Sequence, residues 1–144
     1  QQECIVIAQS MGGIFAVQAA LQKTDLVKGL VLIATSGGID LSPFHVQDWR
    51  NAYQSTFLQH PNWFVNTQVD YSLQLNQIQQ PVLLLWGDCD PISPVAVGHY
   101  LKQQFHNSSL HIVQGGDHLF AAKAISETAE KVKDYLMCLE QKEV

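Results

Sequence analysis

The chain has 144 residues, of which 47% are hydrophobic and 15% are charged, and its formal net charge is −5. This length indicates a single domain, and the apolar share is enough for a core, which argues against a disordered chain. The 8 Lys and Arg residues, set against 13 Asp and Glu, form no basic cluster, so a nucleic-acid-binding protein is disfavoured.

Hydropathy, cysteine content and the first residues narrow the class of protein further. No apolar run reaches the roughly 18 residues of a membrane-spanning helix, and we expect a cytoplasmic protein. The three cysteines show no Cys-x-x-Cys spacing and cannot all pair with one another, so we expect reduced thiols. The chain starts with Gln1-Gln2-Glu3 rather than with Met or a signal peptide, which predicts either processing or a segment upstream.

Three continuously apolar runs predict β-strands, and a weaker run predicts a fourth. These runs cover residues 4–8, 29–35, 81–87 and 110–113. Continuous apolar residues are typical of strands buried on both faces, as in a parallel sheet that is covered by helices. Helical patterns follow the first, third and fourth runs, at residues 11–21, 95–105 and 121–139. We therefore predict an α/β fold, a parallel sheet with helices on both faces.

The segment 41–79 interrupts this alternation and has no strand-like run. It holds seven of the chain's 13 aromatic residues (3 Trp, 4 Tyr and 6 Phe in all). Trp49, Tyr53 and Phe57 are spaced to form one stripe on a helix, which Pro61 is expected to end. The segment is thus predicted to be a small helical insertion between two strands of a core. That core would consist of residues 1–40 and 80–144.

A serine lies in the turn between the first predicted strand and the first predicted helix. Small residues two positions before and after Ser10, Ala8 and Gly12, permit a tight turn at the carboxyl edge of the sheet. The helix N-terminus there favours developing negative charge. Taken alone, such a serine is more often a helix N-cap, and Ala8 replaces the first glycine of the usual Gly-x-Ser-x-Gly pattern.

Candidate acids and a candidate base follow the third and fourth strands. Asp90 is the preferred acid, three residues after Gly87, and Asp88 is the alternative, although both are also common turn formers. His118 lies in the loop after the fourth strand. The other five histidines have no partner at metal-ligand spacing, so no metal site is expected. Serine, acid and histidine at three successive strand ends favour nucleophilic catalysis over helix capping.

With these three loops, the chain resembles the serine hydrolases of the α/β-hydrolase fold. Residues 9–13, 87–94 and 116–118 are similar to that family's nucleophile elbow, acid loop and histidine loop. The resemblance covers nearly the whole chain and implies an esterase- or lipase-like enzyme whose lid is the insertion. It matches the fifth to eighth strands of the family's eight-stranded sheet. We therefore expect the first four strands, and the loop after the third, to be absent from this chain.

The resemblance implies a catalytic triad and a mechanism that uses no cofactor. Ser10 attacks an acyl carbon, His118 acts as general base, and Asp90 fixes the imidazole tautomer and stabilises the imidazolium. The backbone N–H of Met11 is one oxyanion donor, and the second comes from outside the sequence. Loss of one donor typically costs about 10²–10³ in rate, so these residues alone are expected to be nearly inactive.

We expect the aromatic insertion to cover the site and to form an apolar pocket for the acyl or alcohol part of a small-molecule substrate. The candidate pocket residues are Trp49, Tyr53, Trp63, Phe64 and Phe120. Simple packing is the competing interpretation of such a stripe. Cys89, beside the acid, is a candidate reactive thiol, with a packed bystander as the simpler interpretation.

Other functions stay open at this point. A C–C bond hydrolase or lyase of the same fold is compatible with the Ser-Met-Gly-Gly loop, and a catalytically dead binding protein is compatible with the fold. The first strand would lack its neighbour in the family's sheet and would be an exposed edge. We therefore also expect either a partner that supplies the missing N-terminal half or self-association through this edge.

Overall fold

The computed structural model describes residues 2–142, which form one four-stranded parallel sheet. The strands are β1 (Cys4–Gln9), β2 (Val27–Ile33), β3 (Val82–Gly87) and β4 (Ser108–Val113). They lie side by side in sequence order, and each neighbouring pair is parallel. All carboxyl ends therefore meet at one edge of the sheet. The predicted parallel α/β architecture is confirmed, and the strands fall where the apolar runs predict them.

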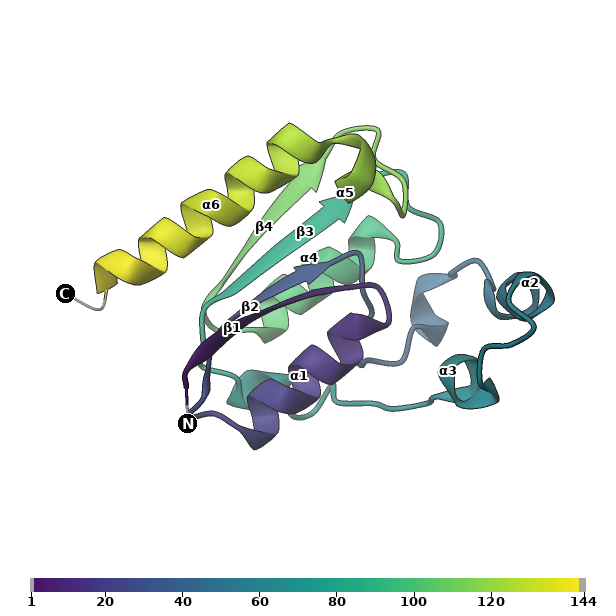
Figure 1. The fold of residues 1–144 in the computed structure, drawn as a ribbon, viewed down its shortest axis with the longest axis horizontal. Coiled ribbons are helices and arrows are strands. Elements are labelled where there is room, and N and C mark those ends of the chain that lie inside the picture. Colours follow the sequence, from purple (N-terminus) through teal and green to yellow (C-terminus); the bar gives the residue numbers. More distant parts are fainter. Residues whose placement is uncertain (1, 143–144) are drawn as a thin grey trace.

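Helices cover both faces of the sheet. Side chains alternate between the two faces along each strand, so a continuously apolar strand presents apolar side chains to the helices on both sides. α1 (Gly12–Gln22) and α4 (Val95–Gln104) pack on one face with Leu30 and Leu32 of β2. The opposite face carries Val31 and Ile33, together with Phe120. The helices on that side are α5 (Phe120–Lys123) and the long α6 (Ile125–Lys142), which lies along β3 and β4 (Figure 1).

The first strand differs from the prediction that it is buried on both faces. Val6 and Ala8 pack against the α1 side, but Ile7, on the opposite face, is 53% exposed. β1 is at the edge of the sheet, and within residues 2–142 no helix covers the Ile7 side of this strand. A continuously apolar run alone does not distinguish an edge strand from a central one.

The last predicted helix, residues 121–139, is divided in two. Ala124 has φ −103° and ψ 56°, which is not helical, and its N–H donates to the Phe120 carbonyl at 2.7 Å. α6 begins immediately afterwards, where the Thr128 N–H donates to the Ala124 carbonyl at 3.0 Å. Apolar residues on both sides of the break keep the same spacing, so the periodicity did not reveal it.

The segment between β2 and β3 contains four short helical pieces, and the second and third of them lie beyond the carboxyl ends of the strands (Figure 1). They are η1 (Ser42–Phe44), α2 (Arg50–Thr56), α3 (Asn62–Asn66) and η2 (Leu75–Gln77). α2 ends at Thr56, earlier than predicted, because Phe57 leaves helical geometry at φ −118° and ψ 66°. Pro61 does not end this helix but serves as the N-cap of α3.

The composition also gave expectations about membrane-spanning helices and about the state of the cysteines. No helix between residues 2 and 142 is long and apolar enough to cross a membrane. All three cysteines, Cys4, Cys89 and Cys138, are free and exposed.

Candidate active site

Ser10 occupies a sharp turn between β1 and α1. Its φ is +52°, in the left-handed region that residues other than glycine rarely adopt. Such backbone strain is typical of functional sites. The turn is closed on both sides: the Ser10 N–H donates to the Ile33 carbonyl at 2.9 Å, and the Gly13 N–H donates to the Ser10 carbonyl at 3.0 Å. A Cβ at Gly12 would lie 3.6 Å from the Cβ of Ala8, which is an ordinary contact, so the turn has room for a methyl group at this position.

The tightest constraint on this turn involves Thr35, a residue that the sequence did not single out. A Cβ added at Gly13 would overlap the Thr35 side chain, whereas one at Gly12 would make only ordinary contact. The buried Thr35 hydroxyl donates to the Ser10 carbonyl at 2.5 Å. Thr35 follows β2 directly, and its position beside the serine depends on the parallel pairing of β1 with β2.

The structure brings Ser10, His118 and Asp90 together from three separate strand ends. The Ser10 Oγ is 3.0 Å from the His118 Nε2, and the His118 Nδ1 is 2.8 Å from an Asp90 carboxylate oxygen. The Asp90 side chain is 0% exposed and that of His118 is 16% exposed. A nucleophile within reach of a base, which is itself oriented by a buried acid, is the arrangement needed for acyl transfer.

The two candidate acids have different positions. Asp90 accepts backbone hydrogen bonds from Ile92 at 2.8 Å and Ser93 at 2.9 Å through one oxygen, which leaves the other for His118. Asp88 is exposed and accepts a hydrogen bond from the Gly115 N–H at 2.6 Å. Asp88 therefore joins the acid loop to the histidine loop through the backbone and is not the carboxylate that contacts the imidazole.

A close approach of two glycines aligns the acid and histidine loops. A Cβ added at Gly87 would overlap the backbone of Gly116, and the Cys89 N–H donates to the Gly116 carbonyl at 2.9 Å. Any side chain at either glycine would push the loops apart, and with them Asp90 and His118. Glycine is therefore required for steric reasons both at Gly87, the last residue of β3, and at Gly116, in the loop after β4.

Cys89 is exposed and is not the packed bystander that the sequence suggested. Its thiol hydrogen-bonds to the Asp88 carboxylate, which also repels the thiolate, and both effects raise the pKa of Cys89 above its ordinary value. A raised pKa lowers the thiolate fraction at neutral pH, and a reactive cysteine requires the opposite shift. The Asp88 carboxylate therefore makes Cys89 a weak nucleophile.

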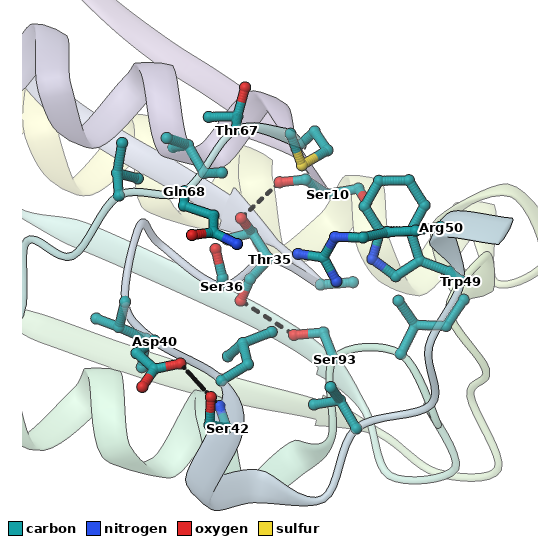
Figure 2. Close-up of a pocket in the computed structure, with 18 of the residues that line it drawn as sticks. Ser10, Thr35, Ser36, Asp40, Ser42, Trp49, Arg50, Thr67, Gln68 and Ser93 are labelled. Atoms are coloured by element: carbon teal, nitrogen blue, oxygen red, sulfur yellow. Dashed lines mark hydrogen bonds between the residues drawn. The ribbon is translucent and has the colours of Figure 1, made fainter. Parts of the chain in front are cut away.

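A cavity of about 750 Å³ opens at the carboxyl edge of the sheet above Ser10 and His118. Figure 2 shows side chains from the loop after β2, from the acid loop and from the helical segment around this cavity. Its apolar wall includes Ile14, Ile39, Leu41, Val46, Val69 and Ile92. Polar groups are equally prominent, and the labelled ones include Thr35, Ser36, Asp40, Arg50, Gln68 and Ser93. The lining is thus mixed, and less aromatic than the sequence indicated.

Only one of the five predicted pocket aromatics, Trp49, lines this cavity. Tyr53 and Phe64 stack on each other at 5.0 Å, and the Tyr53 hydroxyl is 2.5 Å from the Nδ1 of His60, so both serve the packing of the insertion itself. Trp63 is 56% exposed and packs edge-on against Phe15. Phe120 is buried in the core between the sheet and α6. Helical spacing predicted the stripe, but not which side of it faces the site.

Met11, the predicted oxyanion donor, also lines the cavity. It is the N-cap residue of α1, and among residues 2–142 its backbone N–H donates no hydrogen bond to another backbone group. A free N–H next to the serine, at a helix N-terminus, suits a developing oxyanion. As for metals, the described residues contain no group of three or more His, Cys, Asp or Glu side chains that could hold an ion.

Two protein-family models match the chain. One, described as TAP-like protein, matches residues 46–143, and the other, described as alpha/beta hydrolase fold, matches residues 1–67. Both are models of α/β hydrolases, and the former covers more than half of the chain. The chain therefore belongs to the α/β-hydrolase family.

Individual proteins show the same similarity. Uncharacterized hydrolase YugF of Bacillus subtilis is 22% identical and is matched over 94% of this chain and 66% of its own length. Poly(3-hydroxyalkanoate) depolymerase of Ectopseudomonas oleovorans is 36% identical over 70 residues, 49% of this chain and 24% of its own. The structure of a thermophilic esterase from Thermogutta terrifontis is 19% identical with a TM-score of 0.76, over 96% of this chain and 66% of that one. The chain spans less than two thirds of either curated relative.

Proposed function

We propose that this chain contains the catalytic triad of a serine hydrolase that cleaves ester-type bonds. The nucleophile is Ser10, the general base is His118, and the acid that orients the base is Asp90. The observation that supports this most strongly is the continuous contact from the Ser10 Oγ to the His118 Nε2 at 3.0 Å and from His118 Nδ1 to Asp90 at 2.8 Å.

In the first half of the reaction, the Ser10 Oγ attacks the acyl carbon while the His118 Nε2 takes the hydroxyl proton. The carbonyl π electrons move to oxygen, and the resulting oxyanion accepts a hydrogen bond from the Met11 N–H. Collapse of this intermediate breaks the bond to the leaving group, which takes the proton from His118. The product is an acyl ester of Ser10.

In the second half, water attacks the acyl carbon and gives a proton to His118. Collapse returns that proton to the Ser10 Oγ and releases the carboxylic acid. Throughout, one Asp90 oxygen accepts the Nδ1–H of His118, while the other oxygen accepts two backbone N–H groups that hold the carboxylate in place. Since the Asp90 side chain is 0% exposed, its charge acts on the imidazolium with little screening by water.

The substrate proposed is a small or medium-sized molecule with an apolar part. Ile14, Ile39, Val46 and Ile92 offer an apolar wall to an acyl or alcohol chain above Ser10. The ester bond is favoured over the C–C bond by one relative. The name of the Ectopseudomonas oleovorans depolymerase, 36% identical over 70 residues, describes the breakdown of a polymer whose units are joined by ester bonds.

Substrate-panel kinetics on the complete protein tests this proposal. Nitrophenyl esters of short and medium acids are compared with a β-diketone substrate for C–C cleavage. We expect turnover of the esters that is lost in Ser10→Ala and kept in Ser55→Ala, an exposed serine of α2 that does not line the cavity. Turnover of the diketone alone would assign the C–C hydrolase. Absence of any Ser10-dependent turnover would support a binding protein instead.

A further inference from the structure

Arg50 is a cation in the proposed substrate cavity, and the triad mechanism does not use it. Among the described residues that line the cavity, it is the only Lys or Arg. Figure 2 shows its guanidinium group reaching from α2 past Trp49 toward Thr35, on the same side of the cavity as Ser10. Because the side chain is partly exposed, water solvates the guanidinium group until a ligand group of opposite charge replaces that water.

The protein fixes this side chain and pairs it with one acid, Asp48, only at the outer limit of an ion pair. The Nε–H of Arg50 donates to the Val65 carbonyl at 3.0 Å, and the guanidinium carbon lies 5.4 Å from the centre of the Trp49 ring. The nearest acid, Asp48, is 3.9 Å from Nη1, too far for a hydrogen bond, and its Oδ1 already accepts the Arg50 backbone N–H. The two terminal nitrogens therefore remain available to a ligand.

The opposite side of the cavity carries negative charge. Asp40 and Asp70 both line it, and Figure 2 shows Asp40 across the cavity from Arg50. Hydrogen bonds from Ser42 lower the pKa of Asp40, and those from Ser72 lower the pKa of Asp70, so both carboxylates are ionised at neutral pH. An anionic ligand group is therefore repelled from that side and attracted to the Arg50 side.

We propose that Arg50 binds a carboxylate of the substrate, so that the ester cleaved at Ser10 belongs to a molecule that also carries a carboxylate. The inference rests on the proposed function. A guanidinium with two free terminal nitrogens matches a carboxylate in a two-pronged contact. One cation balances one negative charge, and the nearby Asp40 and Asp70 disfavour a dianion such as a phosphate monoester.

The experiment compares matched ester pairs with the complete protein. One pair places the carboxylate on the acyl side: 4-nitrophenyl hydrogen adipate against 4-nitrophenyl hexanoate. The other places it on the alcohol side: 4-carboxyphenyl hexanoate against phenyl hexanoate. We expect one carboxylate ester to exceed its neutral partner in kcat/KM. In Arg50→Gln, this ratio should fall about tenfold or more, mainly through KM.

Two variants serve as controls. Lys102→Gln removes an equal charge from an exposed position of α4, outside the cavity, and should leave the ratio unchanged. Arg50→Lys keeps the charge but loses the two-pronged geometry and should give an intermediate ratio. Because the Arg50 side chain is 46% exposed, the preference should also decrease as the salt concentration rises.

The outcomes separate this inference from the proposed function. Ser10-dependent cleavage of neutral esters, with ratios that Arg50→Gln does not change, would overturn the role of Arg50 and leave the triad intact. A ratio lowered equally by Lys102→Gln would assign the effect to overall charge and overturn it as well. Absence of any Ser10-dependent cleavage would overturn both.

Discussion

The hydroxyl of Thr35 donates a hydrogen bond to the backbone carbonyl of Ser10 at 2.5 Å. The same path continues to the acid loop, where the Ser93 hydroxyl donates to the Thr35 carbonyl at 3.0 Å (Figure 2). The Ser93 N–H in turn donates to Asp90 at 2.9 Å. Thr35, Ser93 and Asp90 are all buried. A chain of hydrogen bonds through Thr35 and Ser93 thus joins the strained turn at Ser10 to Asp90, the carboxylate that orients the base.

Thr35 is therefore expected to be a positioning residue for Ser10. Thr35→Val keeps the shape of the side chain but removes the hydroxyl and leaves the Ser10 carbonyl without this donor. The carbonyl still accepts the Gly13 N–H, so the loss is that of one hydrogen bond, which typically costs about 0.5–1.5 kcal/mol. We expect a fall of up to about tenfold in kcat, measured on a nitrophenyl ester, with KM nearly unchanged. Thr35→Ser restores the donor and should recover most of the rate; equal losses in both variants would point to packing instead.

Gly13 and Gly12 are adjacent glycines that differ in the space available for an added methyl group. A Cβ at Gly13 would overlap the Thr35 side chain, and one at Gly12 would lie 3.6 Å from the Ala8 Cβ. Gly13→Ala should lower the free energy of unfolding by about 1–3 kcal/mol, as overpacking of a core does. Gly12→Ala should be nearly neutral, because added helix propensity offsets the closer contact. Urea unfolding measures both, and equal effects would contradict this account of the turn.

Because Asp90 and not Asp88 contacts His118, replacing each aspartate by asparagine should lower kcat to different extents. Asp90→Asn leaves His118 without its buried carboxylate and should reduce kcat by about 10³–10⁴, the size of effect known for triads of this kind. Asp88→Asn keeps an oxygen that can accept from the Gly115 N–H and should reduce kcat by less than about tenfold. Steady-state kinetics on one ester gives the ranking. A larger loss in Asp88→Asn would reassign the acid.

Tyr135 is expected to make the free energy of unfolding decrease at high pH. Burial raises the pKa of Tyr135 from its ordinary 10.0 to about 12, and its hydroxyl donates to the Pro81 carbonyl at 2.7 Å. Since the neutral phenol is favoured in the folded state, its contribution to stability is complete below pH 10. The contribution is then lost as the pH rises through about 12.

Unfolding in urea at pH 9 and at pH 11 measures this effect. The free energy of unfolding of the unmodified protein should fall more between these values than that of Tyr135→Phe. The variant should be only slightly less stable at pH 9, because the Pro81 carbonyl still accepts the Leu30 N–H at 3.0 Å. Identical pH dependence in both proteins would show that Tyr135 is not the group responsible.

The sequence was sufficient to predict the parallel strands and the candidate triad, for one physical reason. The carboxyl ends of parallel strands all lie along one edge of the sheet, so the loops after β1, β3 and β4 share that edge. That constraint places Ser10, Asp90 and His118 on the same edge without knowledge of any side-chain contact, although β2 lies between β1 and β3.

The cavity could not be predicted in the same way. Its walls come from the segment between β2 and β3, whose short helices pack through aromatic pairs such as Tyr53 with Phe64. Which face of such a helix points to the site depends on loop conformations that periodicity does not encode. Arg50 and Thr35 were missed for the same reason, since each acts through neighbours that are distant in the sequence.

The central claim is that Ser10 is a nucleophile activated by His118 and Asp90, and covalent labelling tests it most directly. The complete protein is treated with a fluorophosphonate probe, digested, and the modified peptide identified by mass spectrometry. We predict one adduct, on Ser10, that is absent in Ser10→Ala and forms much more slowly in His118→Ala and Asp90→Asn. Labelling that proceeds equally well in Ser10→Ala, or at the same rate without His118, would contradict the account.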